Sequence, residues 1–335
     1  MKTLFFEIRG NEKEILSPLL PTQIESVFIA EKLSSKTASL AADAEVVSVF
    51  VDSEVGTDVI GLLPKVKFIC TRSTGYDHID TAFAKTKGIA VANVPSYGAR
   101  TVAEFAFGLI LNLSRKIFNA RHQLMESDDF EIERLEGFDL YGKTLGVVGT
   151  GRIGKNVIKI AKGFGMNVLA SDAKPDAAFA QEQNFKYVSL DELLAASDIV
   201  TLHAPYLKGT HHLINSANIS KMKKGAYLIN TARGELVDTD SLFKALESGH
   251  IAGAGLDVLE SERQLKEEAE LLTRTPEKIK DIKTLLQNHV LINLPNVIIT
   301  PHIAFFSREA HEEILKTTAE NIKAFIAGAP TNLVM

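Results

Sequence analysis

One stretch of this sequence has the residue spacing of a binding site for phosphate groups. The apolar run 144–148 leads directly into Gly149-Thr-Gly151-Arg-Ile-Gly154, and a helical pattern follows. Gly149 would permit a tight turn, Gly151 a close approach of phosphates to the backbone, and Gly154 close packing of the helix on the strand. Free N–H groups at the helix N-terminus would attract the phosphates. The pattern predicts a dinucleotide site.

A carboxylate follows at the distance that such a site requires. The next β-rich run, 167–171, ends at Asp172, roughly 20 residues after the first glycine, as in dinucleotide-binding motifs. Asp172 could accept hydrogen bonds from the ribose hydroxyls and would repel a 2′-phosphate. The sequence therefore predicts NAD rather than NADP as the cofactor, although Lys174 nearby weakens the preference.

A dinucleotide that delivers hydride to a carbonyl group works with an acid that protonates the oxygen, and a substrate carboxylate would need a cation. Arg233 directly follows the apolar run 227–230, and its planar guanidinium suits bidentate binding of a carboxylate. A second segment, rich in small residues, ends in Asp257, Glu260 and Glu262. Any of these carboxylates could orient a histidine and favour its charged form, and spacing does not choose among them.

Two histidines are candidates for the acid. His302 directly follows a β-rich run and Pro301, and His203 also ends such a run. We favour His302 and keep His203 as the rival. The pair His211 and His212 could suggest a metal, but neither a cysteine nor an acidic cluster accompanies it in the sequence, so we expect no metal.

These residues all lie at or just after the ends of predicted strands. Short apolar runs alternate with helical patterns through most of the chain, which is typical of doubly wound α/β sheets. The predicted strands are Thr3–Glu7, Val46–Val51, Lys67–Thr71, Ile89–Asn93, Thr144–Val148, Asn167–Ser171, Ile199–His203, Tyr227–Asn230, Gly253–Val258 and Val297–Thr300. A long helix over about Thr101–Ala120 has a broad apolar face that could also contact a second subunit, and another helix is predicted over about Arg308–Ala327.

Pro and Gly interrupt the pattern near Asn93–Thr101, and a second break lies near Thr300-Pro301. We therefore expect one domain made of residues 1–100 and 300–335, and an inserted dinucleotide-binding domain over 101–299. Residues 262–283 are rich in charges of both signs and read as a solvated helical insertion. The role of this insertion, which extends to about residue 290, is left open.

Composition excludes several other classes of protein. The net charge is −5, so nothing indicates a nucleic-acid or lipid surface as partner. The single cysteine, Cys70, lies in an apolar run and reads as a buried hydrophobic residue. The N-terminal apolar run is too short for a signal peptide, and no stretch reaches the roughly 20 apolar residues of a membrane span. We expect a cytoplasmic location.

Taken together, these segments resemble the D-2-hydroxyacid dehydrogenase family. The resemblance covers nearly the whole chain and rests on six segments in order, of which the last two hold the candidate acid–base residues. They are 72–80 (RSTGYDHID), 102–104 (VAE), 149–154 (GTGRIG), 230–234 (NTARG), 255–262 (GLDVLESE) and 300–304 (TPHIA). Within the family, 94–97 (VPSY) and 302–306 (HIAFF) are most similar to D-lactate dehydrogenases.

The resemblance implies roles that spacing alone left open. It implies Arg233 as carboxylate binder, His302 as general acid–base and Glu262 as its partner, with Asp257 and His203 beside the nicotinamide. The expected cofactor contacts are Gly149, Gly151, Arg152, Ile153, Gly154, Asp172, His203, Pro205, Thr231, Ala232, Arg233, Asp257 and His302. The expected substrate contacts are the backbone N–H groups at Thr74 and Gly75, the pocket residues Tyr97 and Phe305, and Arg233 and His302.

The resemblance also implies a Rossmann NAD-binding domain inserted in a flavodoxin-like substrate domain, and a homodimer through the cofactor domain. The implied activity is NAD-dependent reduction of pyruvate to D-lactate. Alternatives within the family are a bulkier 2-keto acid, hydroxypyruvate or glyoxylate, and phosphoglycerate. We expect phosphoglycerate least, because the chain ends soon after its last predicted helix and leaves no room for a regulatory domain. An alternative of another class is a corepressor-like protein that senses NAD without catalysis.

Overall fold

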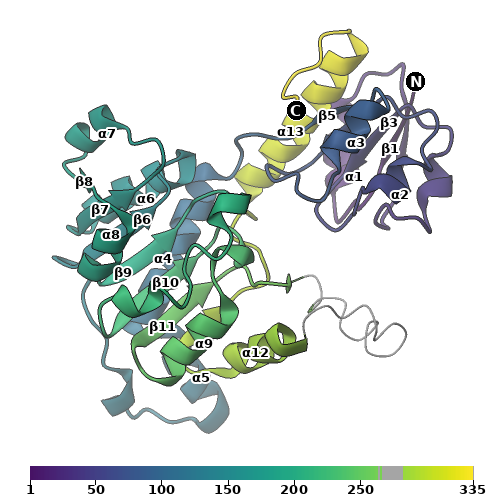
Figure 1. Ribbon diagram of the computed structural model, residues 1–335. Helices are drawn as coiled ribbons and strands as arrows, with labels where there is room; N and C mark the ends of the chain where they lie inside the picture. The colour runs from purple at the N-terminus through teal and green to yellow at the C-terminus, as the bar shows by residue number, and fades with distance from the viewer. Residues whose placement is uncertain (263–264, 266–281, 335) are drawn as a thin grey trace. The chain divides into compact units, whose positions relative to one another are not determined.

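The computed structural model describes residues 1–262, 265 and 282–334. The chain forms two compact units (Figure 1). Unit 1 consists of Met1–Tyr97 and Phe306–Met335, and unit 2 consists of Gly98–Phe305. The chain therefore leaves unit 1 once, builds unit 2, and returns to complete unit 1.

Unit 1 is built on a five-stranded parallel sheet with the strand order β2-β1-β3-β4-β5. Its strands are β1 (Lys2–Phe5), β2 (Glu25–Phe28), β3 (Val46–Val49), β4 (Phe68–Thr71) and β5 (Ala90–Ala92). Its helices are α1 (Glu12–Leu16), α2 (Thr57–Ile60), α3 (Thr81–Thr86) and α13 (Arg308–Ile326). Both β3 and β4 are buried along their whole length, as strands covered on two faces must be.

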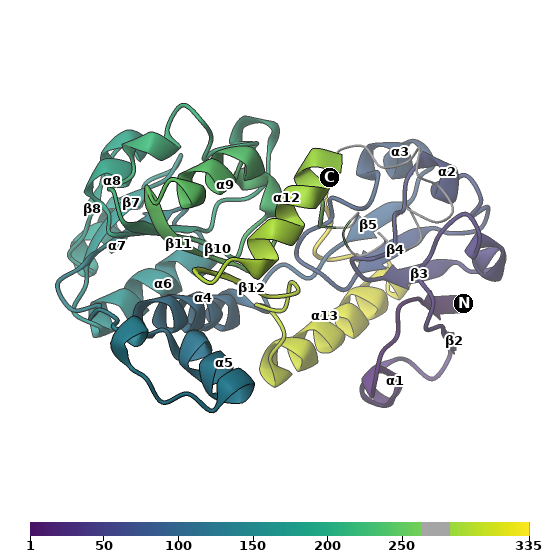
Figure 2. The ribbon, with the colours of Figure 1, turned by 90° about the horizontal axis from the view of Figure 1, so that it is seen from below.

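Each face of the unit 1 sheet has its own apolar core. Val47 and Ile69 pack on one face with residues of α2 and α3, whereas Phe68 packs on the other face with Leu315 and Ile322 of α13. Figure 2 shows α13 along one side of this sheet and α2 and α3 on the other. The C-terminal helix thus completes a core begun by the first 97 residues.

Unit 2 contains a seven-stranded parallel sheet with the order β12-β11-β10-β9-β6-β7-β8. Its strands are β6 (Thr144–Val148), β7 (Asn167–Ser171), β8 (Lys186–Tyr187), β9 (Ile199–Leu202), β10 (Ala226–Asn230), β11 (Ile251–Leu256) and β12 (Val297–Ile299). Its helices are α4 (Ala99–Arg115), α5 (Ile117–Ser127), α6 (Arg152–Gly163), α7 (Ala177–Glu182), α8 (Leu190–Ala196), α9 (Thr239–Glu247) and α12 (Ile282–Asn293).

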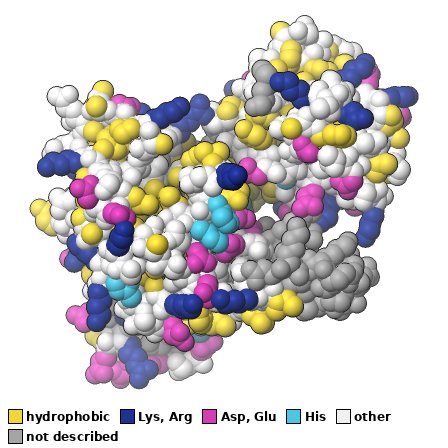
Figure 3. All heavy atoms as spheres, viewed as in Figure 1, with side chains coloured by type: hydrophobic (Ala, Val, Ile, Leu, Met, Phe, Trp, Pro, Cys, Tyr) yellow, Lys and Arg dark blue, Asp and Glu magenta, His cyan; other side chains and the backbone are white. Residues whose placement is uncertain are grey.

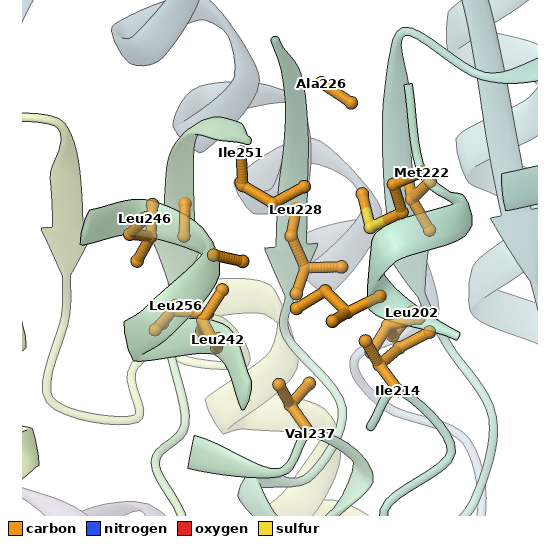
Figure 4. Packing of buried hydrophobic residues seen from close by; sticks show 14 of the residues in the cluster. Leu202, Ile214, Met222, Ala226, Leu228, Val237, Leu242, Leu246, Ile251 and Leu256 are labelled. Carbon is orange, nitrogen blue, oxygen red and sulfur yellow. The ribbon is translucent and has the colours of Figure 1, made fainter. Parts of the chain in front are cut away.

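Helices cover both faces of this sheet as well. Leu228 and Leu256 point to the side of α9, where they pack with Leu242 and Leu246 (Figure 4). The opposite face packs on α4 and α6, with Ile229 among the shared residues. The strand order reverses between β6 and β9, which lie side by side in the sheet. In open α/β sheets, ligands bind beyond the carboxyl ends of the strands at such a reversal.

The predicted α/β class with two doubly wound parallel sheets is confirmed. Of the ten predicted strands, those at 144–148 and 167–171 have the expected bounds, and each of the others differs by one or two residues at one or both ends. The sequence prediction missed β2 and β8 at sheet edges. Both are short and largely exposed or half-buried, so they lack the continuous apolar run that reveals a central strand.

The predicted single helix over 101–120 is wrong. Lys116 adopts the left-handed conformation, with φ 51°, and divides the segment into α4 and α5. The Lys116 ammonium donates to the carbonyl of Arg134, 3.0 Å away, so a contact with a later segment accompanies the break. The apolar face of α4 is mostly buried in unit 2's own core, rather than left open for a second subunit.

The predicted insertion at 262–283 falls largely outside the described residues. Of this segment, only residues 262, 265 and 282–283 are described, and α12 begins at Ile282. Among the described residues, none of the helices has the length and apolar character to cross a membrane.

Candidate active site

The turn after β6 has the backbone geometry that the glycine pattern predicts. Gly149 has φ 91°, and a Cβ there would lie 2.6 Å from the backbone nitrogen of Ala204. A Cβ on Gly154 would lie 2.0 Å from the carbonyl oxygen of Gly149. Both positions therefore require glycine, one for its conformation and both for close packing.

Gly151 differs from its two neighbours in this motif. A Cβ there would meet no atom within 4 Å, so the backbone faces open space directly before α6. Arg152 and Ile153 begin that helix, whose N-terminal end carries positive potential. Open space beside such a helix N-terminus fits a pyrophosphate.

Two buried polar atoms near the ends of neighbouring strands have no hydrogen-bond partner among the described residues. They are Nδ1 of His203, which follows β9, and Oγ1 of Thr231, which follows β10. Buried polar atoms are normally hydrogen-bonded, so atoms of this kind indicate a partner that the protein itself does not supply. The residues around the reversal between β6 and β9 therefore fit a bound dinucleotide.

Asp172 directly follows β7 and is bonded to the glycine turn. Its Oδ2 accepts from the N–H of Thr150, at 2.5 Å, and from the Thr150 hydroxyl, at 2.9 Å. Its Oδ1 accepts from the N–H of Lys174, at 2.7 Å. Burial alone would raise the pKa of Asp172, but these three hydrogen bonds outweigh it and lower the pKa. The carboxylate is therefore charged at neutral pH.

His203 is a poor proton donor in this fold. Burial lowers the pKa of its imidazole to about 3, because the charged form would lose its hydration. Its Nε2 lies 2.9 Å from the hydroxyl of Thr201. Of the two histidines that sequence reasoning left open, His203 is therefore neutral near pH 7.

Arg233 lies in a turn after β10 that Asn230 holds in shape. The Asn230 side chain accepts from the N–H of Ala232, at 3.0 Å, and donates to the carbonyl of Arg233, at 2.8 Å. The guanidinium is half-buried and donates to the carbonyl of Ala232, 2.7 Å away. Sequence reasoning quoted Asn230 only as part of a motif and missed this function.

His302 and Glu262 come together as expected. Nδ1 of His302 lies 3.1 Å from Oε2 of Glu262, and both side chains are mostly buried, with 31% and 21% exposed. His302 has φ 58°, an uncommon backbone conformation for a residue with a side chain. The Phe305 ring meets the imidazole edge to face, with 6.4 Å between ring centres.

Asp257 holds the turn that contains His302 by hydrogen bonds. Its carboxylate accepts from the Thr300 hydroxyl at 2.5 Å, from the N–H of Ile303 at 2.9 Å and from the N–H of Ala304 at 2.8 Å. Burial raises the pKa of Asp257, although these bonds oppose the shift. Asp257 therefore holds the residues on both sides of His302.

The expected substrate contacts Thr74, Gly75 and Tyr97 lie in unit 1. The Thr74 hydroxyl donates to the carbonyl of Val94, 2.8 Å away, and the Thr74 carbonyl accepts from Asn93. Within the described chain, the backbone N–H groups of Thr74 and Gly75 donate to no protein acceptor. Two such adjacent N–H groups could bind an anion.

The chain matches a known protein family. The model of the "D-isomer specific 2-hydroxyacid dehydrogenase, NAD binding domain" family matches residues 107–304, which is more than half of the chain. The chain belongs to this family. The enzyme is accordingly an NAD-dependent oxidoreductase, as the glycine turn and Asp172 had indicated.

Whole-chain relatives agree with the domain match. D-lactate dehydrogenase kk1H of Curvularia clavata is 40% identical over 342 residues, covering 99% of this chain and 94% of that one. The structure of D-lactate dehydrogenase from Aquifex aeolicus, complexed with NAD and lactic acid, has a TM-score of 0.85 at 37% identity, over 98% of this chain and 96% of that one. The structure of D-2-hydroxyisocaproate dehydrogenase has a TM-score of 0.84 at 31% identity, over 100% and 99%.

One cluster beside the dehydrogenase site was not expected. Ligand-type atoms of His212, Asp238 and Glu260 lie within 4.8 Å of one another. No acidic cluster stands beside His212 in the sequence, but Asp238 and Glu260 reach it through the fold. These atoms already have protein partners, since His212 pairs with Glu260 and Asp238 accepts from the Ser241 hydroxyl.

Proposed function

We propose that this dehydrogenase reduces pyruvate to D-lactate, with His302 as proton donor, Glu262 as its partner and Arg233 as binder of the substrate carboxylate. The observation that carries the proposal is the hydrogen bond between His302 Nδ1 and Glu262 Oε2. Because Nδ1 is engaged, Nε2 is the ring nitrogen that can face a substrate.

The three groups have complementary tasks. The guanidinium of Arg233 would bind the carboxylate in a bidentate manner. Bound NADH supplies the hydride that the keto carbon accepts. His302 gives its Nε2 proton to the carbonyl oxygen, which becomes the hydroxyl of lactate. Pyruvate thus gains one hydride and one proton in becoming lactate, which would leave the cofactor as NAD⁺.

We assign the cofactor to unit 2. Gly151 and the first turn of α6, with Arg152 and Ile153, would bind the pyrophosphate, and Asp172 the adenosine ribose. His203 and Thr231 offer the two buried atoms that need a partner, which supports their place beside the nicotinamide end. Pro205, Ala232 and Asp257 belong to the same set of proposed contacts. Unit 1, which supplies Thr74, Gly75 and Tyr97, is the proposed substrate domain.

A branched 2-keto acid is the second candidate substrate. The similarity to D-2-hydroxyisocaproate dehydrogenase favours it, whereas the two lactate dehydrogenases favour pyruvate. Tyr97 and Phe305 are the residues we expect to limit the size of the substrate side chain. Rates of NADH oxidation with pyruvate, 2-ketoisocaproate, phenylpyruvate and hydroxypyruvate decide between them. A higher kcat/KM for 2-ketoisocaproate than for pyruvate would refute the first choice.

The decisive test of the mechanism is His302→Gln. Glutamine keeps a polar side chain of similar reach but cannot transfer a proton as imidazole does. We expect kcat to fall by about 10²- to 10⁴-fold, the usual range for a lost general acid. NADH affinity, measured by fluorescence titration, should stay close to that of the unaltered enzyme.

His122→Gln is the matched control, because His122 lies on α5 with its side chain 54% exposed. It should leave kcat unchanged. Near-normal turnover of His302→Gln would show that another group donates the proton.

We further propose that two copies of the enzyme pair through unit 2. Five large apolar side chains between residues 117 and 132 are more than half exposed, in a segment that starts with α5. They are Ile117, Phe118, Met125, Phe130 and Ile132. A concentration of this kind favours an interface, and the family resemblance indicates a second copy as the occupant.

A further inference from the structure

The three carboxylates that follow β11 have different partners. Glu262 pairs with His302, and Asp257 holds the residues around His302. Glu260 lies between them in sequence, but the hydrogen bonds of its carboxylate go to His212 and Thr239. It is bonded instead to the segments that flank Arg233.

Both carboxylate oxygens of Glu260 are engaged. Oε1 lies 2.6 Å from Nε2 of His212. Oε2 accepts from the hydroxyl of Thr239, at 2.8 Å, and from its N–H, at 3.3 Å. The Glu260 side chain is only 16% exposed, so these charge-assisted bonds are partly shielded from water.

Backbone packing joins the same two segments. A Cβ on Gly234 would lie 2.1 Å from the carbonyl carbon of Leu259 and 2.3 Å from the nitrogen of Glu260. The peptide that follows Arg233 is therefore in direct contact with the peptide that precedes Glu260. Thr239 is the first residue of α9. Residues 234–239 join Arg233 to this helix, and Glu260 contacts both ends of that segment.

His212 brings in a third segment. Its N–H donates to the carbonyl of Glu235, 2.8 Å away, and Ile214 donates to Leu236, 3.0 Å away. His212 itself has φ 49°, which packing must hold in place. The loop after β9 thus runs along the residues that follow Arg233, and the bond to Glu260 fastens it there.

We propose that Glu260, through His212 and Thr239, is a positioning residue that holds Arg233 in place to bind the substrate carboxylate. This inference rests on the proposed role of Arg233. Glu260 does not touch the substrate, because both of its oxygens are committed to protein donors. If residues 234–239 move, Arg233 no longer presents its guanidinium in the bidentate geometry. Binding of the keto acid then weakens.

A bound cation is the competing explanation for the cluster of His212, Asp238 and Glu260. It would need the proton between His212 and Glu260 to be displaced and the Asp238–Ser241 bond to be opened. The hydrogen bonds already satisfy these side chains, which favours the network without a metal.

The test compares Glu260→Ala with Glu260→Gln, and with Asp191→Ala as control. Asp191 is an exposed carboxylate of unit 2 paired with Lys221. We expect Glu260→Ala to raise KM for pyruvate about tenfold and to lower kcat less than threefold, the signature of lost ground-state binding. Glu260→Gln keeps an acceptor for His212 and should restore KM to within about threefold of the unaltered enzyme. NADH affinity and the pH profile of kcat should stay unchanged in all variants.

A double-mutant cycle with Arg233→Gln separates positioning from general loss of structure. Once Arg233 is replaced, Glu260→Ala should raise KM little further. Structural damage unrelated to Arg233 would instead raise KM by the same factor with or without Arg233. If Glu260→Ala does not fold, His212→Gln removes the imidazole that pairs with Glu260 and should likewise raise KM.

The possible failures are distinguishable. If Arg233→Gln leaves KM unchanged, the proposed carboxylate binder is wrong, and the inference falls with it. If only Arg233→Gln raises KM, or if Glu260→Ala shifts the pH profile, the positioning role alone is overturned. A rise in KM after EDTA treatment of the unaltered enzyme would show that a cation, rather than the hydrogen bonds, holds the segment.

Discussion

At the scale of single residues, the surroundings of each group separate chemically similar candidates. His203 and His302 both follow strands, but only His302 has a carboxylate at 3.1 Å, while His203 is buried and neutral. Of the three acids after β11, Glu262 pairs with His302, and Asp257 holds the turn that contains His302. Glu260 instead bonds to the residues that follow Arg233. Burial and partners, rather than residue type, assign these roles.

Asp172 gives a prediction about the cofactor. Asp172→Asn keeps the shape of the side chain and removes the charge that repels a 2′-phosphate. We expect the ratio of kcat/KM for NADH to that for NADPH to fall roughly tenfold, which corresponds to about 1.4 kcal/mol. Kinetics with both cofactors measure this, with Asp191→Asn as control. An unchanged ratio would mean that another group selects NAD.

His203 gives a prediction about stability and pH. The pKa of its imidazole is about 3 in the folded chain and near 6.5 when unfolded. The unfolded chain therefore binds more protons below pH 6.5, so acidification in this window favours unfolding. Its contribution to the free energy of unfolding should fall by up to about 1.4 kcal/mol per pH unit.

Urea denaturation between pH 7 and pH 5 measures this contribution. His203→Gln should show a flatter dependence on pH than the unaltered enzyme. The exposed His122→Gln should not differ from it. Identical slopes for all three proteins would contradict the burial argument.

At the scale of elements, α6 contains a matched pair of glycines. A Cβ on Gly154 would overlap the Gly149 carbonyl, whereas one on Gly163 would meet nothing within 4 Å. Gly154→Ala should lower the free energy of unfolding by about 1–3 kcal/mol and weaken NADH binding, because the turn must shift. Gly163→Ala should raise it by about 0.4–1 kcal/mol, because it restricts the unfolded chain.

Thermal unfolding and fluorescence titration of NADH measure both variants. The first variant tests the fit of helix to turn, and the second tests helix propensity alone. Equal changes in the free energy of unfolding for the two variants would mean that the close packing of α6 on the glycine turn does not stabilise the fold.

The elements that the sequence predicted well are the central strands. β6 and β7 are bounded by Gly and polar residues and carry continuous apolar runs, so their limits are visible in the sequence. The break between α4 and α5 has no Gly or Pro to announce it. It depends on Lys116 and a contact with residue 134, which no local pattern contains.

At the scale of the whole molecule, each unit has its own cores, and α13 completes a core of unit 1. The exposed apolar side chains that favour a dimer lie on unit 2 instead. Phe130 is 83% exposed and Ile132 76% exposed. The proposed pairing therefore depends on the segment after α5, and not on the buried face of α4.

The dimer proposal predicts the effect of Phe130→Ser combined with Ile132→Ser. We expect light scattering after gel filtration to give the mass of two chains for the unaltered enzyme and of one chain for this variant. Removing two large exposed apolar groups takes away apolar area that association would bury. Leu62→Ser, which changes an exposed leucine of unit 1, should remain dimeric. A monomeric unaltered enzyme would refute the proposal.

The α/β class, the glycine turn, Asp172 and Arg233 could be read from local patterns in the sequence. Local patterns also narrowed the acid–base pair to two histidines and three carboxylates, and the family resemblance then indicated His302 and Glu262. These features are visible because glycine geometry and strand periodicity are local, and a motif has a fixed spacing. The partners of Glu260, Asp257 and His212 became known from the folded chain alone. Those bonds join segments far apart in the chain, and burial by distant residues made His203 neutral while leaving His302 beside an acid.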